Sequence, residues 1–187
     1  MTIPASRRGR LSGSEGLTYK ARQVLEDCEL ALEFLEQSTN DQIWRIHWFA
    51  AVALVRTVGD VLDKVDGRNP IYTKSIKSAY QIWKADQDSN KIFWCFIKEQ
   101  RDKLIHEYDS DAHPSHSASI VLEFDLVSLA DGTKTRHGTA IELEENIYRP
   151  MLAGPWEGDD ARDVLREAID WWSIELDKID LEAHNKR

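Results

Sequence analysis

Apolar side chains recur at steps of three and four residues along most of this chain, which is the spacing of one face of an α-helix. The pattern predicts five helices, over about residues 18–37, 41–65, 73–86, 90–108 and 159–181. The second is the most regular, with a continuous apolar seam of Trp44, Trp48, Ala51, Val55, Val58, Leu62 and Val65. Phe49, Val52 and Leu54 add apolar surface beside this seam, so we expect the second helix at the centre of the fold.

Residues that favour helix ends and turns separate these segments. Thr18 stands at the predicted start of the first helix, and Asn40 or Asp41 at the start of the second. Their side chains can accept hydrogen bonds from backbone N–H groups of the first helical turn. The sequence from Asp66 to Pro70 contains Gly, Asn and Pro and predicts the end of the second helix.

Between residues 118 and 144 the apolar period changes from helical to two. The even-numbered residues from Ile120 to Leu126 are large and apolar, and a turn signal follows at residues 130–133. This predicts a β-hairpin over about residues 118–144. Because an isolated hairpin is only marginally stable, we expect its apolar face to lie on a helix.

These patterns predict a mainly α fold, an antiparallel bundle of four to five helices with a small β-hairpin insertion. The chain has 187 residues, which is the size of one domain, and we expect residues 17–187 to form it. Residues 1–16 are rich in Ser, Gly and Arg without any period, so we predict a disordered basic tail there.

The charge of the chain limits the candidate functions. The net charge is −9, but residues 1–22 hold five basic residues and one acid, a charge of +4, which leaves −13 on the rest. Phosphate neutralisation supplies most non-specific affinity for nucleic acids, so the acidic body argues against a broad nucleic-acid surface. RNA binding would need a local basic pocket or the basic tail.

The two cysteines and the apolar runs bear on the compartment. Cys28 and Cys95 lie inside apolar, helix-like stretches, which suits core residues in a reducing compartment better than a disulfide. No apolar run is long enough to cross a bilayer, and the basic N-terminus lacks the apolar segment of a secretory signal. We therefore expect a cytoplasmic protein with no membrane segment.

The candidate chemistry lies near the end of the fourth predicted helix, in the sequence Arg-Asp-Lys-Leu-Ile-His-Glu-Tyr from position 101. Arg101, His106 and Tyr108 are its chemically distinctive residues, and Asp102 follows the arginine directly. An arginine fork matches a phosphate group and stabilises negative charge that grows during its transfer. A neutral histidine can take a proton near physiological pH. Asp102, one helical turn from His106, can fix its tautomer and orientation.

Arginine, four residues, histidine, one residue, tyrosine, with a polar residue after the arginine, resembles the signature of HEPN domains. It is most similar to the HEPN toxins paired with minimal nucleotidyltransferases. The resemblance covers about residues 18–110 and does not explain the hairpin or the last helix. It implies a HEPN-like bundle and a homodimer whose two motifs line a shared cleft.

The resemblance also implies an activity, a metal-independent endoribonuclease of a toxin or defence system that leaves 2′,3′-cyclic phosphate ends. In that reading Arg101, His106 and Asp102 are catalytic, with RNA as the substrate and no cofactor or metal. Tyr108 matches the position that accepts AMP from the partner nucleotidyltransferase, which would be the antitoxin. Helix geometry agrees with a dimer, because Arg101 and His106 lie about 140° apart on one helix and do not aim at one point.

Other interpretations of the same residues stay open. Arg101 can form an ordinary ion pair, His106 can be favoured by the helix dipole, and Tyr108 can be a core residue. A non-catalytic HEPN-like module that binds or assembles with a partner is the alternative function, and the acidic body favours it. A third interpretation is an unrelated helical bundle in which the motif occurs by chance. His113 and His116, with nearby acids, are better explained as loop histidines than as a metal site.

Overall fold

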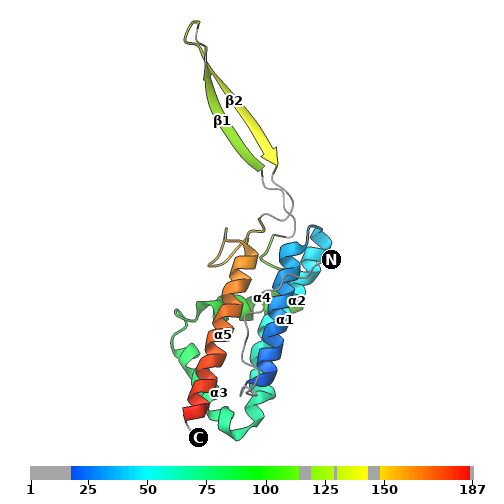
Figure 1. Ribbon diagram of the computed structural model, residues 1–187, viewed down its shortest axis with the longest axis vertical. Coiled ribbons are helices and arrows are strands. Elements are labelled where there is room, and N and C mark those ends of the chain that lie inside the picture. The colour runs from blue at the N-terminus through cyan, green and yellow to red at the C-terminus, as the bar shows by residue number, and fades with distance from the viewer. Residues whose placement is uncertain (1–17, 114–118, 129, 143–147, 186–187) are drawn as a thin grey trace, which may run out of the picture.

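Three long helices run side by side and form the frame of the fold (Figure 1). They are α1 (Tyr19–Gln37), α2 (Asp41–Lys64) and α5 (Ala161–Asn185), and α1 packs against both of the others. These elements belong to a computed structural model that describes residues 18–113, 119–128, 130–142 and 148–185. The predicted tail, residues 1–16, lies outside the described residues. The predicted last helix is confirmed, but it begins two residues later than about 159 and extends four residues beyond 181.

Shorter helices connect α2 to the hairpin. A 3₁₀ turn, η1 (Asp66–Arg68), leads into α3 (Pro70–Ala85), a π-helix, η2 (Ile92–Lys98), and then α4 (Glu99–Glu107). The single helix predicted over 90–108 is therefore two elements. The wide π turns accommodate an apolar run and bury Ile92, Phe93, Phe96 and Ile97. Because a π turn holds more residues than an α turn, the motif residues on α4 point in other directions relative to the buried residues of η2 than in one continuous α-helix.

The apolar seam predicted for the second helix is confirmed, because its residues from Trp44 to Leu62 are all buried. Val65 is the exception: it follows the helix and is 41% exposed. Trp172 of α5 closes the core against α2, and its indole N–H donates to the Val55 carbonyl at 2.8 Å. A Cβ atom at Gly59 would lie 3.0 Å from the Trp172 ring, so this close approach of two helices depends on glycine.

The helix ends are capped partly by residues distant in sequence. Thr18 occupies the N-cap position of α1 as predicted, but its side chain does not cap the helix, because its hydroxyl donates to Asp180 at 3.1 Å. The Asp66 carboxylate accepts from the backbone N–H groups of Lys20 and Ala21 and so caps α1 from the turn after α2. The Asn40 cap of α2 is confirmed, since its side chain accepts from two N–H groups of the first turn.

The hairpin consists of β1 (Ser119–Val127) and β2 (Lys134–Glu142), paired antiparallel with Phe124 opposite His137. It extends beyond one end of the bundle (Figure 1). Among the described residues no strand contacts a helix, so the expectation that the hairpin lies on a helix is wrong. The two chain segments that lead to it pair briefly beside the bundle, at an antiparallel bridge between Ala112 and Met151. This bridge forms the root of the hairpin.

The mainly α fold with a small hairpin insertion is confirmed. Among the described residues, no helix combines the length and the apolar composition needed to cross a membrane.

Candidate functional site

The four motif residues lie on α4 and on the residue that follows it. Acidic residues in the first turn of α4 and His106 in its last turn both suit the helix dipole. Arg101 and Asp102 are partly exposed, and His106 and Tyr108 are exposed. The whole motif therefore reaches the surface, and the interpretation of Tyr108 as a core residue is wrong, since it is 69% exposed.

Arg101 and Asp102 contact each other. The Arg101 Nη1 atom lies 3.1 Å from the Asp102 Oδ1 atom, in an ion pair whose side chains are 36% and 47% exposed. A pair this exposed contributes little to stability, about 0–1 kcal/mol. Its effect is local: the carboxylate holds the guanidinium near the helix surface. The sequence prediction that Asp102 orients His106 stays a prediction.

His106 stands apart from Arg101 on the same helix. Five residues separate the two, so their side chains leave α4 about 140° apart. Among the described residues no bond joins His106 to Arg101 or to Asp102. One copy of α4 therefore offers an arginine near its start and a histidine in its last turn on different sides of the helix, and a single reaction centre would need a second copy.

Tyr108 has an unusual backbone conformation for its type. Its φ of 53° and ψ of 37° are left-handed, and it is the one described residue other than glycine with positive φ. Glycine or asparagine is usual at such a helix end, because a Cβ atom strains this conformation. The ring packs edge-on against Phe49 of α2, with centroids 5.1 Å apart. Seven residues separate Tyr108 from Arg101, a spacing that would place both on one face of a continuous helix. The left-handed conformation instead turns Tyr108 away from that face, and its ring packs against α2.

A clasp around Asp111 fixes the chain directly after the motif. The Asp111 carboxylate accepts from Gln100 Nε2 and from Lys103 Nζ, both at 2.6 Å. Ser110 accepts a hydrogen bond from the Trp48 indole at 2.6 Å, and the Asp111 carbonyl accepts from the Leu152 N–H at 2.6 Å. The clasp thus ties α4, α2 and the root of the hairpin together. Asp111 carries no sequence signal for this role, because its partners are fixed only by the fold.

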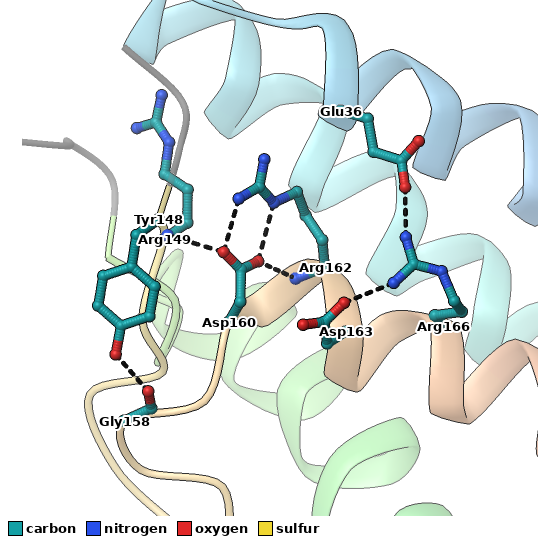
Figure 2. A network of polar contacts seen from close by, with 8 residues as sticks. All are labelled: Glu36, Tyr148, Arg149, Gly158, Asp160, Arg162, Asp163 and Arg166. Atoms are coloured by element: carbon teal, nitrogen blue, oxygen red, sulfur yellow. Dashed lines mark hydrogen bonds and ion pairs between the residues drawn. The ribbon is translucent and has the colours of Figure 1, made fainter. Parts of the chain in front are cut away.

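A second polar network lies at the start of α5 (Figure 2). Arg149 is fully buried, its Nη1 atom lies 2.8 Å from Asp41, and its guanidinium stacks on Trp44. Asp160 accepts from the Arg149 N–H and from the Arg162 guanidinium. Burial raises the pKa of Asp160, but the hydrogen bonds from Arg162 and Arg149 outweigh it and hold the pKa below its ordinary value. These pairings neutralise the arginines, so the network is structural: it joins the hairpin root to α2 and α5.

Two grooves of the described surface lie away from the motif. They have volumes of about 410 and about 490 Å³, run along α5 and share Ser89, Trp171 and Ile174. None of the four motif residues lines either groove. Within the described ranges, no three histidine, cysteine or carboxylate side chains converge as metal ligands would. In one copy the surface-exposed motif therefore lies outside both of these grooves.

No protein-family model, no curated protein and no solved structure matches this chain. The resemblance to HEPN domains consequently rests on the motif and its place in a helical bundle.

Proposed function

We propose that this protein is a HEPN-type endoribonuclease that acts as a homodimer, without a metal, as a toxin or defence component. The observation that carries the proposal is that Arg101, Asp102, His106 and Tyr108 all reach the surface along α4 and its C-terminal cap. The left-handed Tyr108 adds support, because strained backbone is concentrated at functional sites.

The residues suit cleavage of RNA by its own 2′-hydroxyl. Arg101 binds the scissile phosphate, with Asp102 holding its guanidinium, and stabilises the charge that develops on the phosphate oxygens. His106 takes the proton from the 2′-hydroxyl as its oxygen attacks phosphorus. The bond from phosphorus to the 5′-oxygen breaks, and this oxygen takes a proton from the histidine of the second copy. The products are a 2′,3′-cyclic phosphate and a 5′-hydroxyl.

Two copies are required by this scheme, because one α4 directs Arg101 and His106 to different sides. A shared cleft between two copies of α4 supplies both residue types to one phosphate. Tyr108 lies at the edge of such a cleft, and AMP transferred to its hydroxyl by a nucleotidyltransferase-type antitoxin would place a bulky anion where RNA binds. The exposure of Tyr108 leaves room for this modification.

The test compares initial rates of RNA cleavage in EDTA for the wild type, Arg101→Ala and His106→Ala. Loss of a general base lowers a rate by about 10²–10⁴-fold, so we expect at least about a 100-fold loss in His106→Ala. His184→Ala is the matched control, since His184 is also an exposed histidine in the last turn of a helix. Arg68→Ala, at an exposed site in η1, is the control for the arginine. Equal loss in the controls would contradict the assignment.

A non-catalytic binding module is the second candidate. Its support is the net charge of −9, together with the position of the motif outside both grooves. Absence of cleavage by the pure wild type, with Tyr108 unmodified by mass spectrometry, would favour this candidate over the nuclease.

A further inference from the structure

The two faces of the hairpin differ in chemistry. In the observed register Leu122, Phe124, Leu126 and Ile141 lie on one face, which we call the apolar face, with Thr135, His137 and Thr139. The other face carries the charged residues Glu123, Asp125, Lys134 and Arg136, and Glu123 pairs with Arg136. The apolar face thus has no permanently charged residue among these positions.

The apolar face is uncovered in the single chain. Its four large aliphatic and aromatic residues are each about half exposed, between 46% and 52%. Two-stranded hairpins are marginal in water unless another layer covers their apolar side, and no described helix contacts this one. Because the hairpin extends away from its own bundle, the layer that covers its apolar face must come from another molecule.

We propose that the apolar face is a self-association surface, which packs against the same face of a second copy of this chain. A two-fold contact sets a surface against itself, so like charges on it would repel, and an uncharged face avoids this cost. The hairpin also extends beyond the bundle, so two hairpins can pair while the two acidic bundles, which repel each other at a net charge of −9 per chain, stay apart. A charged macromolecule would find no complementary charge on this face.

The available area agrees with a dimer of moderate strength. Half of the roughly 200 Å² of an aromatic side chain is ~100 Å² for Phe124, and the three smaller aliphatic residues offer somewhat less each, so the four offer ~350 Å² per copy and ~700 Å² for two. The two threonines and His137 on the same face bring the total toward the ~1,200 Å² at which specific interfaces begin. We therefore expect a dimer that dissociates on dilution.

The hairpin contact itself follows from the exposed apolar face alone. Only the role of the resulting dimer in RNA cleavage rests on the proposed function. The root of the hairpin is tied to α4 through Asp111, so pairing of two hairpins also links two copies of the motif region in one particle.

The test is sedimentation velocity of the full chain between about 1 and 100 µM, for the wild type, Phe124→Lys and Val121→Lys. Val121 is the matched control, because it lies on the opposite face of the same strand and is 64% exposed. Lysine is chosen because a positive charge cannot weaken association of an acidic chain by general repulsion. We expect a wild-type dimer of twice 21.5 kDa, at least about 30-fold weaker association in Phe124→Lys, and little change in Val121→Lys.

A wild type that is monomeric at 100 µM, or that dissociates equally with both lysines, would overturn the self-association surface. A monomer that instead co-sediments with lipid vesicles would also overturn it and assign the face to membranes. RNA cleavage measured on the same samples separates this result from the proposed function. A dimer that cleaves RNA and that Phe124→Lys leaves intact would overturn only the hairpin contact, and an inactive dimer that Phe124→Lys dissociates would overturn only the nuclease. An active monomer would overturn both the hairpin contact and the homodimeric scheme.

Discussion

Replacement of Asp111 by alanine should destabilise the protein through the clasp that follows the motif. Asp111 is 17% exposed at its side chain and accepts hydrogen bonds from Gln100 and Lys103 at 2.6 Å. Gln100 is only 4% exposed, so the substitution leaves its amide N–H buried without this acceptor. Lys103 is 38% exposed at its side chain and can turn to water.

The expected magnitude follows from these two contacts. A buried donor left without an acceptor costs about 1–3 kcal/mol. The half-exposed ion pair contributes less than about 1 kcal/mol after solvent screening. We therefore expect Asp111→Ala to lose about 2–3 kcal/mol, or about 5–10 °C of melting temperature for a domain of this size. Asp111→Asn keeps an acceptor for Gln100 and should lose only about 1 kcal/mol.

Thermal unfolding followed by circular dichroism measures this loss. Asp109→Ala is the matched control, because Asp109 is exposed and its carboxylate bonds only the adjacent Ser110 N–H. The control should stay within about 0.5 kcal/mol of the wild type. If Asp111→Ala and Asp109→Ala melt together, the clasp does not hold the end of α4 and the reasoning fails.

Two further predictions concern α1. Asp66→Ala should lower the free energy of unfolding by about 1 kcal/mol, because it removes the carboxylate that caps the described start of α1. Chemical denaturation measures this loss, and an unchanged denaturation midpoint would contradict the cap. Burial, with smaller effects of Asp27 and Glu29, raises the pKa of the Cys28 thiol to about 12, so a native-state thiol assay at pH 8 should label Cys95 and spare Cys28. Because the thiolate of Cys28 forms more readily in the unfolded chain, native stability should fall as the pH rises above 9, and less so in Cys28→Ala. Equal labelling of both thiols would refute the burial of Cys28.

The helices were predictable from sequence because their apolar spacing is local and regular. The seam from Trp44 to Leu62 fixes α2, and the buried stripe of α5 includes Leu165, Ala168, Trp172 and Ile179, which recur at helical spacing. The structure begins α3 three residues before its predicted start at 73, because Pro70 both follows the end of the previous helix and is favoured in a first helical turn.

Features set by distant residues were not predictable. Asp66 caps a helix 45 residues earlier in the chain, and the buried Glu175 accepts a hydrogen bond from the Trp83 indole at 2.7 Å. Neither contact leaves a periodic trace in the sequence. The hairpin was predictable from the alternation of apolar and polar residues. This alternation indicates that one face is apolar, but it does not indicate what covers that face. The motif residues were found by their spacing, whereas the left-handed Tyr108 required coordinates.

The most direct test of the nuclease assignment is the chemical nature of the RNA ends. Purified wild-type protein is incubated with RNA in EDTA, and the fragments are weighed by mass spectrometry beside those from His106→Ala. The account predicts 2′,3′-cyclic phosphate and 5′-hydroxyl ends from the wild type and uncleaved RNA from the variant. Fragments with 5′-phosphate ends, or intact RNA from a wild type whose Tyr108 is unmodified, would contradict it.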